Sequence, residues 1–205
     1  MKLKIFYGLD LDVNVVKDTI SQLDWFILNK YNYKNFSYPK SLDKEKLRNY
    51  SENEIKKSVT SEFSDCLYKD NEKFLLDNWG SVSKEIQTAL LKSSIEPLEE
   101  YIIYLTRYGT GGSYSLPNTI IVNINFYSNV GLLRTIIHEI IHLSIQKYID
   151  QYKVGQWQKE RLVDLFFIKN FPKRINMQNM PINTEKIDDI FDKNYPNMEE
   201  VIKKI

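Results

Sequence analysis

The spacing of hydrophobic and polar residues predicts a strand and then an amphipathic helix at the start of the chain. Residues 2–8 alternate more and less apolar side chains, which is typical of a short strand. Residues 12–31 repeat apolar side chains at helical intervals, and Asp12 is a candidate N-cap. The apolar positions of this expected helix are Val13, Val16, Ile20, Leu23, Phe26 and Ile27.

The next segments favour helices. Residues 41–79 are rich in charge, Tyr and Asn, and they contain weaker helical patterns near 51–67 and 70–78. Residues 81–97 show a clearer pattern, which predicts a helix that begins at Ser81 or Ser83 and ends at Pro97.

The pattern changes to strands after residue 97. Residues 98–108 and 118–126 are rich in β-branched and aromatic side chains, which predicts two strands. The segment between them, GTGGSYSLP, holds three of the seven glycines and predicts a loop. Because this loop has neither the Lys-Ser/Thr end nor the glycine spacing of a phosphate-binding loop, we interpret it as a turn or a cleft rim.

Helical patterns return in the last third of the chain. We expect a strongly apolar helix over 129–149, a break at Gly155, and a helix over 158–171 that Pro172 closes. Two short helices are expected near 184–193 and 197–204. The whole pattern predicts an α+β fold in one domain, 1–205, with a small mixed sheet packed on helices and a C-terminal helical part.

Composition and charge exclude several classes of protein. Hydrophobic residues make up 42% and charged residues 27% of 205, which is typical of a globular chain. The formal charge of +1 gives no broad electrostatic field that would attract nucleic acid or anionic lipid, so we expect neither as a partner.

The sequence contains no signal-peptide pattern or membrane span, so we expect a cytoplasmic protein. The single cysteine, Cys66, excludes an intrachain disulfide and is expected to be a buried or half-buried structural thiol.

The candidate chemistry lies in the apolar helix. His138 and His142 are the only histidines, and they stand four residues apart with Glu139 beside the first. On a helix this spacing aims two imidazoles at one point, as a zinc site requires. Glu139, about 100° round the helix, is placed to reach a metal-bound water instead. The alternative is that both histidines are polar groups of the core without a metal.

A third protein ligand must be a carboxylate, because no other histidine exists. Asp150 lies near the end of the same helix, about 120° round from His138, and points away. Glu160 is on the following helix, which can fold back after Gly155, and Asp164 is one turn further on the same face. A solvated helix face is the alternative for this acidic pair.

The two motifs together, HEIIH at 138–142 and ERLVD at 160–164, resemble the gluzincin type of zincin metallopeptidases. The resemblance implies that His138, His142 and Glu160 hold Zn²⁺ and that Glu139 is the general base. It also implies that Asp164 accepts the other ring N–H of His138, which fixes the orientation of that ring.

The same resemblance implies a strand at the edge of an active-site cleft. Residues 118–126 occupy that place, where they could pair with an extended peptide, and an ordinary interior strand is the equal alternative. With no histidine left to stabilise an oxyanion, the donor would be Tyr or Arg. Tyr152 is the first candidate, followed by Tyr148 and Tyr195.

These patterns predict a zinc metallopeptidase that hydrolyses peptide bonds through a metal-activated water and acts on a protein or peptide substrate. Two alternatives use the same residues differently. The first is a non-catalytic zinc-binding module that senses the metal or regulates a partner, and the second is a metal-free helical interaction protein.

Overall fold

A computed structural model describes residues 1–126, 128–172 and 180–205, in which helices surround one four-stranded mixed sheet. The strand order is β1-β2-β4-β3, with β1, β2 and β4 parallel and β3 antiparallel to β4. The α+β class expected from the sequence is therefore confirmed. The strands are β1 (Lys2–Phe6), β2 (Glu100–Thr106), β3 (Gly112–Ser115) and β4 (Thr119–Asn123).

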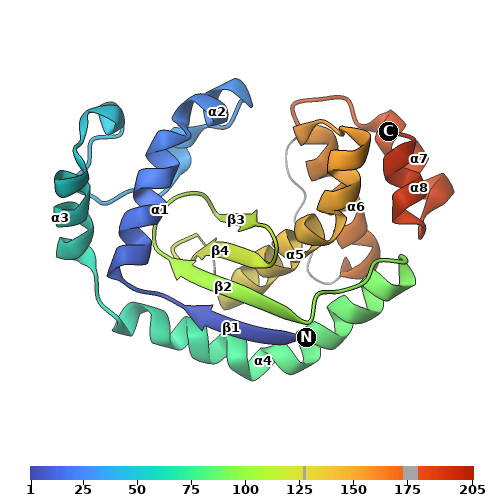
Figure 1. Ribbon diagram of the computed structural model, residues 1–205, viewed down its shortest axis with the longest axis horizontal. Coiled ribbons are helices and arrows are strands. Elements are labelled where there is room, and N and C mark those ends of the chain that lie inside the picture. Colours follow the sequence, from blue (N-terminus) through green and yellow to red (C-terminus); the bar gives the residue numbers. More distant parts are fainter. Residues whose placement is uncertain (127, 173–179) are drawn as a thin grey trace.

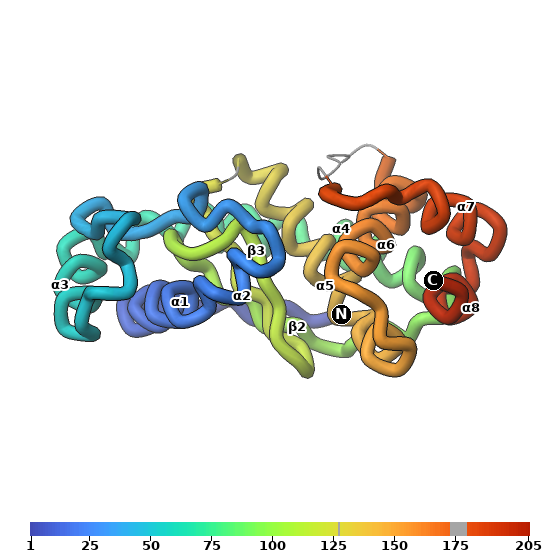
Figure 2. Tube along the Cα trace, turned by 90° about the horizontal axis from the view of Figure 1, so that it is seen from above, coloured from blue at the N-terminus to red at the C-terminus, as the bar shows by residue number. Residues whose placement is uncertain are grey.

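The helices gather at both ends of the sheet (Figure 1). At one end lie α1, α2 and α3, at the other α6, α7 and α8, and the view from above shows the elongated molecule that results (Figure 2). The core follows this division, with one apolar cluster around α1–α3 and a larger one around the sheet, α4 and the C-terminal helices. The helices are α1 (Leu9–Ser21), α2 (Leu23–Leu28), α3 (Glu52–Glu62), α4 (Cys66–Lys92), α5 (Asn129–Tyr152), α6 (Gln156–Asn170), α7 (Glu185–Asn194) and α8 (Met198–Lys203).

The N-terminal helix differs from the expectation. It begins at Leu9 and is divided at Gln22 into α1 and α2. Asp12 is not an N-cap but a fully buried side chain, which accepts hydrogen bonds from Tyr68 on α4 and Thr106 on β2. The expectation failed because a buried carboxylate with two hydroxyl donors is satisfied without a helix end.

The helix α4 is longer than the pattern predicted. It runs through Gly80 without interruption, so neither Ser81 nor Ser83 begins a helix. Each of these serines instead donates its hydroxyl to a carbonyl three residues earlier, at Asn78 and Gly80. Cys66, expected to be buried or half-buried, is exposed at the start of this helix.

On this side of the sheet the edge strand is β3, not the segment 118–126. β4, which lies in that segment, pairs with β2 on one side and β3 on the other, so the interior alternative is correct. β3 lies inside the expected loop, and Gly112 opens it. A short strand with Gly and Ser lacks the β-branched residues that mark strands in a sequence.

The helices α5 and α6 form a hairpin that carries the candidate chemistry. α5 ends at Tyr152, where Lys153 takes a left-handed conformation with φ 54°, and Gly155 immediately precedes α6. α5 is apolar on nearly every side because it packs on the sheet and on α4, α6 and α8. None of the helices in the described ranges is long and apolar enough to cross a membrane.

Candidate metal centre

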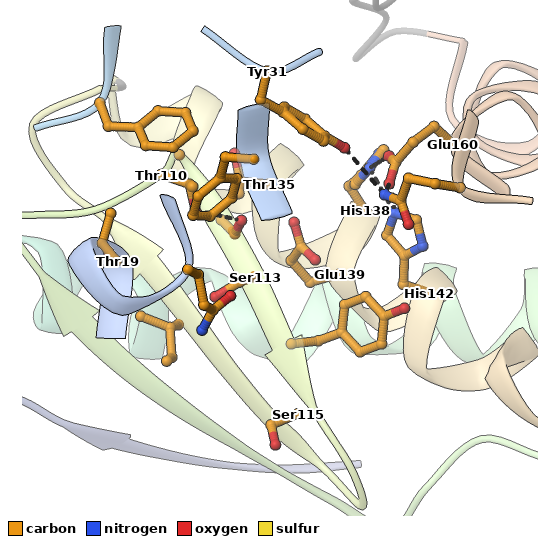
Figure 3. Close-up of a pocket in the computed structure, with 18 of the residues that line it drawn as sticks. Thr19, Tyr31, Thr110, Ser113, Ser115, Thr135, His138, Glu139, His142 and Glu160 are labelled. Carbon is orange, nitrogen blue, oxygen red and sulfur yellow. Dashed lines mark hydrogen bonds and ion pairs between the residues drawn. The ribbon is translucent and has the colours of Figure 1, made fainter. Parts of the chain in front are cut away.

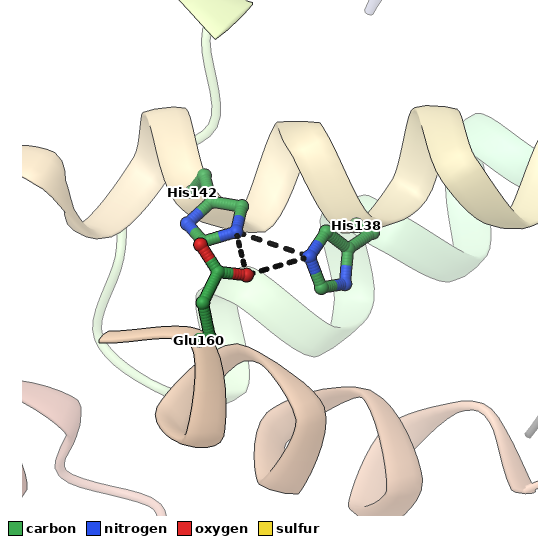
Figure 4. A group of neighbouring side chains, drawn as sticks. All are labelled: His138, His142 and Glu160. Carbon is green, nitrogen blue, oxygen red and sulfur yellow. Dashed lines mark hydrogen bonds and ion pairs between the residues drawn. The ribbon is translucent and has the colours of Figure 1, made fainter. Parts of the chain in front are cut away.

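Three ligand atoms converge between α5 and α6 (Figure 4). Nε2 of His138 lies 3.0 Å from Nε2 of His142, and Oε2 of Glu160 lies 3.2 Å from His142 Nε2 and 3.5 Å from His138 Nε2. A tetrahedral ion with bonds of about 2.0–2.1 Å needs ligand atoms about 3.3 Å apart. The three distances therefore fit a metal ion held by these side chains.

The local sequence explains this convergence. His138 and His142 are one turn apart on α5, so both rings leave the same face of the helix. The connection between α5 and α6 has only residues 153–155, which brings Glu160 back opposite both rings. All three side chains lie in the apolar interface of the hairpin, where polar groups need partners.

Two further side chains orient the ligands. Gln156, one turn before Glu160, donates its amide to Oε1 of Glu160 at 2.7 Å, which leaves Oε2 for the metal position. Oδ1 of Asp164 lies 3.9 Å from Nδ1 of His138, on the side of the ring away from the metal position. An acid there favours the tautomer whose Nε2 is unprotonated.

Burial and charge set the protonation of the ligands. Burial lowers the pKa of His142 to about 4, so this ring is neutral near pH 7. Burial also acts to lower the pKa of His138, but the carboxylates of Glu160, Glu139 and Asp164 outweigh it and raise the pKa. Burial opposes ionisation of Glu160, and the two histidines nevertheless hold its pKa well below the usual value. A divalent cation binds imidazoles in their neutral form, so His142 is ready to bind it and His138 must first lose any proton that it holds.

Glu139 lies beside the ligand group without belonging to it. Its carboxylate faces β3 and is buried, and burial raises its pKa to about 7. β3 comes so close that a Cβ atom on Gly112 would lie 2.7 Å from Oε1 of Glu139 and 2.5 Å from Cγ2 of Thr135. Glycine at this position therefore lets the edge strand lie against the acid.

A cavity of about 830 Å³ opens over this group (Figure 3). Residues 110–115, which include β3, line one side, and residues from α5 and α6 line another. The third wall comes from α1, from α2 and the segment that follows it, and from the loop after β2. Its aromatic residues are Trp25, Phe26, Tyr31, Phe36 and Tyr108.

The tyrosines expected from sequence lie elsewhere. Tyr152 donates its hydroxyl to Glu199 at 3.3 Å, and it does not line the cavity. Tyr195 donates to Asn170, and Tyr148 is buried beside Lys147. The structure thus does not bring Tyr152 to the ligand group.

Tyr31 enters the cavity from the opposite wall (Figure 3). Its ring stacks on Trp157 at 5.0 Å, and its oxygen accepts a hydrogen bond from Gln156 at 3.0 Å. Burial and the charge of Glu160 raise its pKa to about 12, so the hydroxyl keeps its proton. No local pattern in the sequence distinguishes this residue among fourteen tyrosines.

Tyr114 on β3 supports the other side of the ligand group. Its ring stacks on His142 with 5.1 Å between centroids. Its hydroxyl donates to Gln146 at 2.6 Å and accepts from Lys159 at 3.0 Å. The edge strand is thereby fixed to both helices of the hairpin.

The chain matches no protein-family model, no curated protein and no solved structure. The resemblance to the gluzincins therefore remains a prediction that rests on two motifs. The cluster of His138, His142 and Glu160 is a group that could hold a metal ion.

Proposed function

We propose that this protein is a zinc-dependent hydrolase of peptide bonds. The observation that carries the proposal is the arrangement of Glu139 next to a tetrahedral set of ligand atoms, at the wall of an open cavity. A structural metal site needs four protein ligands, whereas a catalytic site leaves one position for water or substrate. Three protein ligands beside a buried acid support the catalytic kind.

Zinc is the metal that this ligand set suits best. Two imidazole nitrogens and one carboxylate oxygen form a recurrent catalytic zinc set, and the spacing fits tetrahedral bonds. Magnesium and calcium prefer oxygen ligands in larger numbers, so this site suits them poorly.

The residues of the chain would divide the reaction between them. Bound zinc supplies a Lewis acid that lowers the pKa of water and polarises a carbonyl group. Glu139 takes the proton of the attacking water and passes it to the nitrogen of the leaving amine. A carboxyl group with a pKa near the working pH can do both, and burial raises that of Glu139 to about 7.

Tyr31 replaces Tyr152 as our candidate for stabilising the oxyanion. Its oxygen accepts from Gln156, and its own O–H remains to donate. Figure 3 shows the hydroxyl directed from the opposite wall toward the ligand group. A neutral donor held in a buried site stabilises developing negative charge with little reorganisation.

The free edge of β3 is the candidate binding surface for the peptide backbone. In the part of the chain that the structure describes, β3 pairs only with β4, and its residues line the cavity. An extended peptide can add to such an edge through main-chain hydrogen bonds, which are independent of the peptide's sequence. This mode of binding fits a peptide substrate better than a compact small molecule.

Cleavage of a peptide library by wild type and by Glu139→Gln tests the proposal. The wild type should bind one equivalent of zinc and cleave, whereas Glu139→Gln should bind zinc equally and lose about a hundredfold to ten-thousandfold in rate. A protein that binds zinc but cleaves nothing would point to the non-catalytic module, and one that binds no zinc would contradict both readings of the site.

A further inference from the structure

One arginine that lines the cavity has no partner among the described residues. Arg134 lies one turn before His138 on α5, is half-buried and lines the cavity. It makes no hydrogen bond or ion pair with any residue that the structure describes. The other arginines in the described ranges are all paired: Arg48 with Asp24, Arg107 with Asn125 and the carbonyl of Glu62, and Arg161 with Asp188.

Two other charged groups near the ligands have partners. Lys159 donates to Tyr114, and Glu160 is engaged by Gln156 and the two histidines. Arg134 is thus a cation that lines the cavity and uses none of its donors on the residues that the structure describes. A guanidinium presents these donors in a planar fork that matches a carboxylate.

The contacts of β3 show how the strand is oriented relative to α5. Gly112 lies against Thr135 and Glu139, and Tyr114 lies against His142, so β3 and α5 run the same way. Figure 3 shows Thr110 near Thr135 and Ser115 further along the strand. Arg134 therefore lies toward the Thr110 end of the strand.

A peptide added antiparallel to β3 would run from the Ser115 end to the Thr110 end. Antiparallel pairing is the slightly more stable mode for an added strand. Residues after the scissile bond would then lie on the side of Arg134. Four helical residues separate Arg134 from His138, a rise of about 6 Å, which equals about two residues of extended peptide.

We propose that Arg134 binds a carboxylate that the substrate carries one or two residues after the scissile bond. This inference rests on the proposed function, because it takes the ligand group as the point of cleavage. The carboxylate belongs either to the free C-terminus of a short peptide or to an Asp or Glu side chain. Both present the same group to the guanidinium.

Binding of metal-chelating peptides to the zinc-loaded protein tests the proposal without cleavage. The probes are hydroxamates that carry two residues in four versions: a free C-terminal carboxylate or its amide, and an amidated chain that ends in Glu or in Gln. Calorimetry should give about tenfold to a hundredfold tighter binding for at least one carboxylate probe than for its neutral counterpart. The pair that shows the difference identifies the source of the carboxylate.

Arg134→Gln should abolish that difference while keeping the affinity for the neutral probes and one equivalent of zinc. Lys147→Gln is the matched control, because Lys147 is an exposed cation on the same helix that does not line the cavity. It should retain the full preference. Equal binding of charged and neutral probes, or a preference that survives Arg134→Gln, would overturn the proposal.

Failure of the proposed function gives a different result. If no peptide is cleaved, the hydroxamates still report on Arg134, because their binding needs only the metal. If peptides are cleaved through Glu139 but no probe prefers a carboxylate, the hydrolase remains and the role of Arg134 is rejected.

Discussion

At the scale of single residues, burial and neighbouring charges set the pKa values of the candidate site. His138 and His142 are alike in sequence, yet burial keeps His142 neutral while the surrounding acids raise the pKa of His138. Glu139 and Glu160 differ in the same way. Glu160 faces two imidazoles and stays ionised, and Glu139 faces the backbone of β3 and holds its proton up to a pKa of about 7. This difference suits the roles proposed for them, with Glu160 as a metal ligand and Glu139 as a base.

Tyr31→Phe is expected to slow cleavage while leaving the metal bound. Removing one donor to a developing oxyanion costs about a hundredfold to a thousandfold in kcat. KM and zinc content should stay within about twofold of wild type, because the phenyl ring keeps its stacking on Trp157. Steady-state kinetics and metal analysis measure both effects.

Tyr33→Phe is the matched control for this substitution. Tyr33 is two residues away in the same segment, but it does not line the cavity. It should leave kcat unchanged. Equal kcat values for Tyr31→Phe and wild type would remove Tyr31 from the mechanism.

At the scale of elements, strong periodic patterns in the sequence predicted helices and strands correctly, and weak patterns did not. α5, α6 and β2 carry long apolar patterns, and the structure has them close to the expected positions. β3 has two Ser, one Gly and one Tyr, so its strand conformation comes from pairing with β4 rather than from its own residues. The periodic pattern likewise did not predict the break at Gln22 or the continuity of α4 at Gly80.

The candidate site also contains residues that the sequence pattern predicts and one that it does not. His138, His142 and Glu160 follow from spacing on adjacent helices, and the structure brings these three together. Tyr31 could not be found in this way. It lies 129 positions before Glu160 in the chain, and only the packing of the N-terminal segment on α6 brings it near.

Gly112→Ala tests the close approach of β3 to α5. The added Cβ would meet Thr135 and Glu139 at 2.5 and 2.7 Å, so the strand or the helix must shift. We expect the free energy of unfolding to fall by about 1–3 kcal/mol, the usual cost of overpacking. Cleavage should fall as well, because the shift displaces Glu139.

Gly80→Ala is the control for the same chemical change. Gly80 lies inside α4, and a Cβ there would have no atom within 4 Å. It should raise the free energy of unfolding by about 0.5–1 kcal/mol through helix propensity. Denaturant titrations of the two variants should therefore move in opposite directions. A neutral or stabilising Gly112→Ala would contradict the proposed contact.

At the scale of the whole molecule, the cavity lies where the two apolar clusters meet. The cluster of α1–α3 supplies most of the aromatic side chains that line it. The candidate metal ligands and Glu139 lie on α5 and α6, whose apolar side chains belong to the larger cluster. Few direct contacts cross this cavity, and Tyr31 with Gln156 and Trp157 makes one of them. Binding of substrate would therefore add contacts between parts of the chain that are otherwise joined mainly through the sheet.

Zinc binding should raise the free energy of unfolding, and this gain should shrink as the pH falls. Free zinc at a hundred times its dissociation constant adds about 2.7 kcal/mol to the free energy of unfolding. As the pH falls below the raised pKa of His138, a proton must leave that ring before zinc can bind. His142 stays neutral down to a pKa of about 4, so it adds no second proton between pH 5 and 7.

Below the raised pKa of His138, zinc binding should therefore weaken by about 1.4 kcal/mol per pH unit, the value for one proton. Glu139→Gln is the suitable background, because it removes the titration of Glu139 from the measurement. Calorimetry in buffers of different ionisation enthalpy should count one proton released per zinc, and thermal unfolding should show the matching loss of stability. Release of two protons between pH 5 and 7 would mean that both histidines are charged in the metal-free protein, which contradicts the burial of His142.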